Sequence, residues 1–174
     1  MKYISVGDAL VELGLEVSVD GDPTTRAELK RSSVIYNGAA LPSWTTIIST
    51  MFRLQKFEYV REIEASIDER LIVVSGASPS KHIRYITKRR LADSAKNGDI
   101  EDKRKFDKEA ASRGVTSDEL VDLIISKSND LGDVIIELED LAVRAEKTIS
   151  AAKDETEITA IFKALHVQIG KIGS

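Results

Sequence analysis

The sequence predicts a mainly α fold with a small β-hairpin, in which an N-terminal αββ unit precedes a multi-helix bundle or coiled-coil-like region. Of the 174 residues 42% are apolar but only 5% are aromatic, so the core must consist chiefly of aliphatic side chains, as at helix seams. After residue 43, apolar residues recur three and four positions apart, which is the spacing of one helix face. We therefore expect a small docking unit over residues 1–42 and a helical region over residues 43–174.

The first 42 residues carry the signals of a short helix and two strands. Ser5 is a good N-cap with an acid three residues later, and Gly14 is a typical helix stop. Residues 15–19 then alternate between apolar and polar, and residues 33–38 run into an Asn-Gly turn signal. The two strands can pair antiparallel across a polar loop over residues 23–31. A two-stranded ribbon is marginal alone, so we expect it to pack on a helix or on another chain.

Two helices are expected next, one from residue 44 and one over residues 79–96. Ser43 can cap the first, which is one long amphipathic helix or two in series. Its last stretch, "LIVVSG", could also form a short strand because it is β-branched, but we favour a helix. For the second helix, Ser78 is the N-cap and Asn97-Gly98 is the stop.

The following segment predicts two more helix starts. Asp99 can cap a helix over residues 100–113, which Gly114 closes. Thr116 and Glu119 then match a capping box, the strongest local signal in the chain. We expect a long helix to begin there.

An apolar seam runs along this long helix with the alternating three- and four-residue spacing of a coiled coil or bundle. Lys127 interrupts the seam, and Gly132 costs about 1 kcal/mol relative to Ala inside a helix, so residues 128–133 could instead form a break between two helices. We expect the seam to pack in a bundle with copies of the chain, and the sequence leaves open whether the seam faces its own chain or another copy. Its positions are Leu120, Ile124, Lys127, Leu131, Val134, Leu138, Leu141, Ala145, Thr148 and Ala152, of which the seven from Leu120 to Ala145 other than Lys127 are the oligomer candidates.

A last helix is expected to start at Asp154 or Thr156 and to carry Ile158, Phe162 and Leu165 on its apolar face. Residues 166–174 resemble a Gly-containing tail.

Several chemistries have no residues to support them. The chain has no cysteine, which excludes disulfides and thiolate metal sites, and its two histidines are too few for the usual structural zinc modules. Neither histidine adjoins a nucleophile-elbow pattern. We expect no enzyme activity, no cofactor and no metal. A secretory signal and a run long enough to cross a membrane are also lacking, which predicts a protein made in the cytoplasm.

A basic segment stands out against the net charge of −4. Its five cations share one broad helix face, opposite an apolar side formed by Ile83, Ile86 and Leu91. Such a face could neutralise phosphates, although it lacks a known nucleic-acid-binding context. It could equally attract acidic helices, because the remainder of the chain has 20 basic and 29 acidic residues, a balance of −9. We favour acidic helices over nucleic acid as the partner of Lys81, Arg84, Lys88, Arg89 and Arg90.

Trp44, the only tryptophan, stands at the start of a predicted helix. We interpret it as an anchor between the N-terminal unit and the helices. The sharper alternative is an aromatic contact for a partner protein.

Two passages resemble proteins encoded in the tail gene clusters of tailed phages. The first is "VIYNGAALPSWTTI", which is similar to the short N-terminal units of tail and tail-fibre-associated proteins, where a strand leads through a Leu-Pro-(Ser/Thr) step into a helix. The second, "KEAASRGVTSDELVDLIISKSNDLGDVIIELEDLAVRAEKTISAAKDETEITAIF", resembles their helical C-terminal halves. Together the passages cover about half of the chain.

The resemblance implies a virion component or an assembly factor of a phage tail. It implies no catalytic residue, since such passages are structural in those proteins. The expected partners are other tail proteins and copies of the same chain, with nucleic acid as the alternative and no membrane. The expected location is the virion, or otherwise the host cytoplasm.

Overall fold

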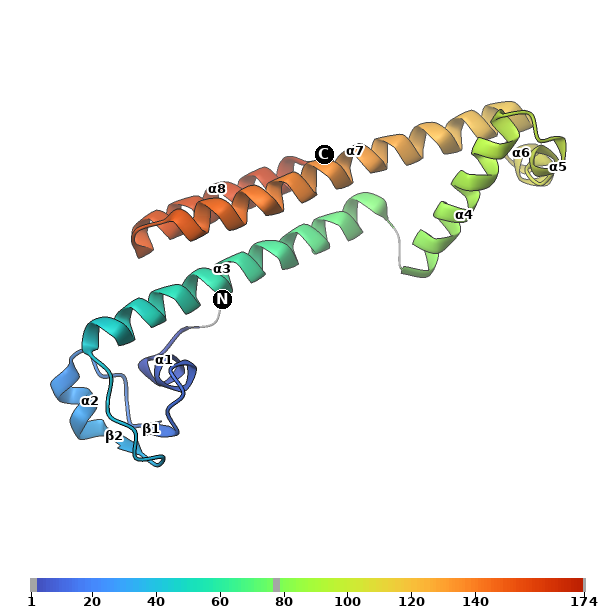
Figure 1. The fold of residues 1–174 in the computed structure, drawn as a ribbon. Helices are drawn as coiled ribbons and strands as arrows, with labels where there is room; N and C mark the ends of the chain where they lie inside the picture. The colour runs from blue at the N-terminus through green and yellow to red at the C-terminus, as the bar shows by residue number, and fades with distance from the viewer. Residues whose placement is uncertain (1–2, 77–78, 174) are drawn as a thin grey trace. The chain divides into compact units, whose positions relative to one another are not determined.

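The structure, a computed structural model, describes residues 3–76 and 79–173, and the side chains of residues 79–82 lie outside this description. In these residues the protein is mainly α-helical with a small antiparallel hairpin, which confirms the expected fold class (Figure 1). The elements are, in order, α1 (Val6–Glu12), β1 (Val17–Val19), α2 (Arg26–Ser32), β2 (Ser33–Ile35), α3 (Trp44–Ser75), α4 (Pro79–Lys96), α5 (Ile100–Arg104), α6 (Asp107–Arg113), α7 (Ser117–Ala151) and α8 (Glu155–Lys171).

The chain groups into two compact units. The first unit combines residues 1–65 with residues 142–167, and the second combines residues 66–141 with residues 168–174. The first unit thus holds the N-terminal segment together with parts of α3, α7 and α8. The expectation that residues 1–42 act as a docking unit of their own stays a prediction.

Local capping fixes α1 as the sequence predicts. The Ser5 hydroxyl accepts a hydrogen bond from the Asp8 amide at 3.1 Å, and the Asp8 carboxylate accepts one from the Ser5 amide at 2.9 Å. This reciprocal pair satisfies amides that the first turn of a helix leaves without partners. The α1 helix therefore begins where its capping box places it.

The hairpin forms as predicted, but its connection does not. β1 and β2 pair antiparallel with Val17 opposite Ile35. The segment between them was expected to be a polar loop, yet it folds into α2. Thr25 caps α2 by accepting a bond from the Glu28 amide at 3.2 Å. Leu29 is the single large apolar residue of α2 and is fully buried. One apolar residue makes no helical repeat in the sequence, so the packing that stabilises α2 could not be predicted from the sequence.

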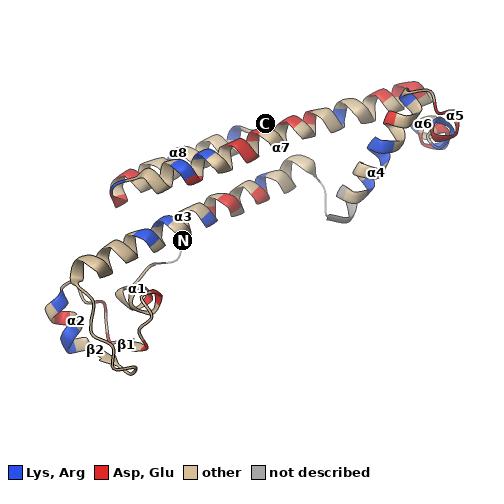
Figure 2. Ribbon diagram, viewed as in Figure 1, with Lys and Arg blue, Asp and Glu red and all other residues tan. Residues whose placement is uncertain are grey.

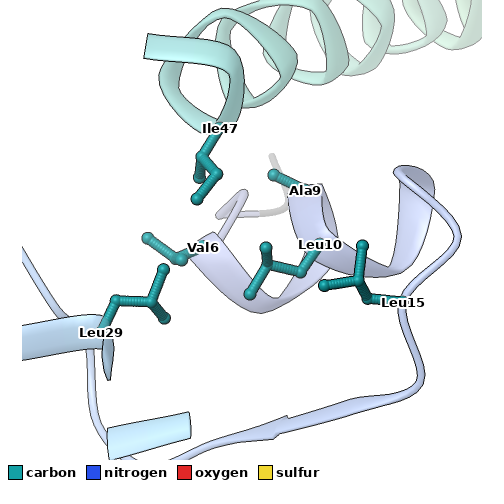
Figure 3. Close-up of a cluster of buried hydrophobic side chains, with 6 residues drawn as sticks. All are labelled: Val6, Ala9, Leu10, Leu15, Leu29 and Ile47. Atoms are coloured by element: carbon teal, nitrogen blue, oxygen red, sulfur yellow. The ribbon is translucent and has the colours of Figure 1, made fainter. Parts of the chain in front are cut away.

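A compact apolar cluster holds the N-terminal segment together. Leu29 from α2 and Ile47 from α3 point toward α1 in the close-up (Figure 3). Every one of the six central side chains is nearly or completely inaccessible to solvent, so α1 and α2 are anchored directly on the start of α3. The six are Val6, Ala9, Leu10, Leu15, Leu29 and Ile47.

In the first unit, α3 contacts the α7–α8 hairpin. The Lys56 ammonium donates a hydrogen bond to the Ser150 carbonyl at 2.7 Å. The Tyr59 ring packs edge-on against Phe162, with ring centroids 4.9 Å apart. α3 is one continuous helix, so neither a break nor a strand at "LIVVSG" is present.

Residues 166–171 belong to a helix, and two of the apolar residues near the C-terminus are buried, which contradicts the expected tail. α8 continues to Lys171, and within the second unit Ile169 and Ile172 are buried. There the Arg70 guanidinium also donates a hydrogen bond to the Ile172 carbonyl at 2.7 Å. The glycines near the end suggested a tail, but the burial of Ile169 and Ile172 holds this segment against the second unit.

Residues 100–113, expected to form a single helix, form two. α5 ends at Arg104 and α6 begins at Asp107. Phe106 lies between them and is almost completely buried, where it packs with the inner residues of α4 and α7. The break in the helix therefore coincides with the residue that fills this core.

The α7 helix runs without interruption through Gly132, so the segment 128–133 is not a break. At its far end the expected seam is out of phase, because Ile149 is buried while Thr148 is exposed. A straight helix has 3.6 residues per turn and drifts away from a strict seven-residue repeat, which accounts for this one-position shift.

Candidate functional site

The residues that the sequence assigns to partner binding lie mainly on α4, in the second unit. Ala92 and Ala95 form its inner face, and their small side chains allow the helix to approach its neighbours closely. α4 ends at the predicted stop, where Gly98 adopts a φ of +100° that favours glycine. The core beneath α4 consists of Ala92, Ala95, Phe106, Ala110, Leu120 and Val121.

Lys88 binds an acid of its own chain. Its ammonium lies 2.6 and 2.8 Å from the two carboxylate oxygens of Glu109 on α6, and Arg113 reaches the same carboxylate at 2.7 Å. The hydrogen bond from Lys88, and then the charges of both cations, lower the pKa of Glu109. Lys88 therefore fastens α4 to α6.

Arg89 connects α4 to α7. One guanidinium nitrogen donates to the Ile125 carbonyl at 2.9 Å and to the Asn129 side-chain oxygen at 2.7 Å. Its Nε atom contacts Asp93 at 2.8 Å. The fork geometry of arginine suits this combination of acceptors. Two of the predicted partner-binding cations thus make contacts within the chain.

The apolar side of α4 is not covered where the sequence pattern places it. Ile83 and Ile86 are 68% and 60% exposed, whereas Leu91 is half-buried against the core. Arg84 and Arg90 are exposed as well, and the side chain of Lys81 lies outside the described residues. Figure 2 shows the blue bands of Lys and Arg along α4. α4 therefore presents isoleucine together with arginine to solvent.

The predicted oligomer seam on α7 is largely used inside the chain. Leu120, Leu138, Leu141 and Ala145 are buried within a single copy. The role of the seam in holding copies of the chain together stays a prediction. The remaining three positions are partly exposed, and they are Ile124, Leu131 and Val134.

Trp44 packs against the N-terminal cluster beside Ile47, at the first turn of α3. It is half-buried. This position matches the anchor interpretation, because the indole contacts the cluster that joins the N-terminal segment to α3. The alternative role as a partner contact stays a prediction.

An open groove of about 610 Å³, which the sequence did not predict, lies in the first unit between α3 and the end of α7. Its apolar lining includes Phe52 and Phe57, the latter 64% exposed. The Lys56 ammonium lies 4.6 Å from the centre of the Phe52 ring, within cation–π range. Ser49, Phe52 and Lys56 are three and four residues apart in the sequence, and this helical spacing indicates that they share one face of α3.

Two cations at the groove are paired within the chain. Arg53 lies 2.6 Å from Glu12, and Arg61 lies 2.8 Å from Glu58. Ion pairs with nearby acids reduce the attraction of the groove for an anion. The groove therefore offers aromatic surface more than positive charge.

The described residues form neither a metal-binding cluster nor a helix suited to crossing a membrane. Across 3–76 and 79–173, no three His, Asp or Glu side chains gather as metal ligands do. In the same ranges, every helix falls short of the combined length and apolarity that a bilayer crossing requires.

Protein-family models, curated proteins and solved structures gave no match to this chain. The resemblance to phage tail proteins accordingly rests on the two sequence passages alone.

Proposed function

We propose that this protein is a non-enzymatic assembly component that acts through helix-mediated contacts with copies of itself and with other proteins. The observation that carries the proposal is that α3, α4 and α7 each expose a pair of large aliphatic residues. Single exposed apolar residues are ordinary, but neighbouring ones on one helix are typical of interaction surfaces. The clearest exposed residues are Ile72 and Val73 on α3, Ile83 and Ile86 on α4, and Ile136 and Val143 on α7.

The setting that we propose is a bacteriophage tail. It is supported by the resemblance of "VIYNGAALPSWTTI" and of the long helical passage to tail and tail-fibre-associated proteins. An extended helix such as α7, which has 35 residues, suits a structural role in such an assembly.

The assembly role is tested by light scattering on the purified protein over a range of concentrations. We expect a mass that rises above that of the 19.2 kDa chain as concentration increases. A constant monomer mass, together with no binding to any virion particle, would overturn the proposal.

The phage setting has a separate test in the genes that flank the coding sequence. Tail genes are expected on at least one side. If the flanking genes encode no virion protein and the chain is absent from purified particles, the tail setting is wrong even if the protein assembles.

A second candidate function is binding of nucleic acid by α4. Its support is the composition of the helix, which has six Lys and Arg residues and one Asp, a net charge of +5. Against it, Lys88 and Arg89 already bind groups of the same chain. The other basic residues of the predicted site are Lys81, Arg84 and Arg90.

Fluorescence anisotropy with labelled duplex DNA and RNA tests this alternative. Binding that weakens with salt and is lost in the triple variant Lys81→Glu, Arg84→Glu, Arg90→Glu would favour it. Lys127→Glu, an exposed change on α7, is the matched control. No anisotropy change at low salt would dismiss it.

A further inference from the structure

The groove in the first unit runs along α3 for about four helical turns. Its lining on α3 begins at Ser49 and ends at Glu64, which corresponds to a length of about 22 Å along the helix. The other wall is formed by Glu146 and Ser150, which lie one turn apart near the end of α7. All of these residues belong to the first unit, so the groove is a feature of that unit alone.

Apolar side chains line the groove between its ends. Phe57 is 64% exposed, and Phe52 and Val60 are half-buried. Phe57 and Val60 are three residues apart, so they lie on the same side of α3. Removing such apolar surface from water favours binding, and aromatic side chains are frequent anchors of protein interfaces.

The cations of the groove are occupied within the chain. Arg53 and Arg61 form the two ion pairs described above. The Lys56 ammonium donates a hydrogen bond to the Ser150 carbonyl at 2.7 Å and also lies over an aromatic ring of its own helix. A phosphate or another anion would have to compete with these contacts.

Two carboxylates of the groove differ from these cations. Glu64 on α3 and Glu146 on α7 are both exposed. Within residues 3–76 and 79–173, neither carboxylate takes part in a hydrogen bond or an ion pair. Opposite charges beside an apolar contact select the partner, and like charges exclude it. The groove therefore favours a cationic partner over an anionic one.

A helix is the partner shape that this groove suits. The backbone groups of α3 and α7 are bonded within their own helices, so an extended peptide has no sheet edge to join. A small ligand is normally enclosed over most of its surface, whereas this groove is open to solvent. An amphipathic helix, by contrast, can lay its apolar face into a hydrophobic groove.

We propose that this groove binds a basic amphipathic helix of another protein. The apolar face of that helix covers Phe57 and Val60, and Lys or Arg side chains beside this face pair with Glu64 and Glu146. The inference rests on the proposed contacts with other proteins and names the chemistry of one such partner. It does not require the chain to assemble with copies of itself.

The test uses the full chain and a fluorescent model peptide of about 14 residues, which is about four helical turns. The peptide consists of Leu and Lys, with the leucines three and four positions apart so that they share one helix face. Fluorescence anisotropy at about 0.15 M salt measures its dissociation constant, and we expect saturable binding.

Two control peptides separate charge and shape from general apolar adhesion. One has the same pattern with Glu in place of Lys, and the other has the same Leu and Lys composition with the leucines scattered around the helix. Both are expected to bind at least about tenfold more weakly than the patterned Leu and Lys peptide.

Variants of the chain locate the binding surface. Phe57→Ser should weaken binding of the Leu and Lys peptide at least about tenfold, because it removes the exposed anchor of the groove. Val73→Ser, a 62% exposed position of α3 that does not line the groove, is the matched control and should leave binding unchanged. Circular dichroism checks that both variants are folded.

Charge reversal provides a second readout. Glu64→Lys with Glu146→Lys should weaken binding of the Leu and Lys peptide and strengthen binding of the Leu and Glu peptide. Glu69→Lys with Glu139→Lys makes the same change of charge at exposed acids of the same two helices outside the groove, and it should not reverse the preference.

The outcomes separate this inference from the proposed self-assembly. If the Leu and Lys peptide does not bind, if the control peptides bind equally well, or if Phe57→Ser has no effect, the groove is not the docking site. Self-assembly, measured by light scattering without peptide, is unaffected by those results. If Phe57→Ser instead lowers the mass of the assembled chain, the groove holds a second copy, which overturns its assignment to another protein.

A monomeric chain that binds the peptide through Phe57 would support the groove inference while self-assembly fails.

Discussion

Phe106 is the largest side chain in the small core beneath α4, and it separates α5 from α6. Replacing a buried phenylalanine with alanine removes apolar contacts and leaves a cavity, at a cost of about 3–5 kcal/mol. We expect Phe106→Ala to lower the free energy of unfolding by that order, measured by urea denaturation. Phe57→Ala, at a 64% exposed position, should change it by less than about 0.5 kcal/mol. Equal effects would contradict the packing role of Phe106.

Glu109 should make stability depend on acid pH. Lys88 lowers the pKa of the Glu109 carboxyl group in the folded chain. The contribution of this carboxylate to the free energy of unfolding is therefore complete above the unfolded pKa of about 4.3, and it disappears as the pH falls through the folded pKa. Glu109→Gln should therefore be less stable than the unaltered chain at neutral pH, and the two should converge in acid. The measurement is urea denaturation across a pH series. Glu137→Gln on α7 is the control, and parallel curves for Glu109→Gln would contradict the expectation.

At the scale of elements, Gly132 tests the continuity of α7. A methyl group at this position would meet no atom within 4 Å, and the residue lies inside a regular helix. Gly132→Ala should therefore stabilise the protein by up to about 1 kcal/mol, measured by thermal and urea unfolding. Gly98→Ala should do the reverse, because its φ of +100° strains any side chain. Destabilisation by Gly132→Ala would indicate a break in α7.

Local signals predicted the elements whose ends are fixed by their own residues. Thr116 and Glu119 form the expected capping box, with the Glu119 amide 3.2 Å from the Thr116 hydroxyl. Elements that depend on distant packing were missed. α2 depends on the burial of Leu29, and the end of α8 depends on Ile169 and Ile172.

The candidate site shows the same division. The limits of α4 could be predicted, but not which of its faces turns inward. That choice depends on Glu109 and Asn129, which follow Lys88 and Arg89 by 21 and 40 residues. Pairing of a basic residue with an acid so far along the chain leaves no periodic trace in the sequence.

At the scale of the whole molecule, the uneven distribution of charge makes a prediction about salt. α4 and α7 carry net charges of +5 and −6, so we expect attraction between such helices to contribute to the proposed self-assembly, and salt shortens the reach of this attraction from about 10 Å at 0.1 M to about 3 Å at 1 M. We expect self-association to weaken as sodium chloride rises, measured by sedimentation velocity. Unchanged or stronger association in high salt would indicate a contact dominated by apolar burial instead.

The two compact units also share long helices, so their unfolding need not be independent. Trp44 is the only tryptophan of the chain and packs on the N-terminal cluster of the first unit. Its fluorescence is consequently a built-in reporter of that cluster, while far-ultraviolet circular dichroism registers the helices of both units. Coincident curves from these two signals would be consistent with one cooperative transition, and separated curves would reveal a partly folded state. The position of a single indole thus allows the cooperativity of the molecule to be measured without adding a label.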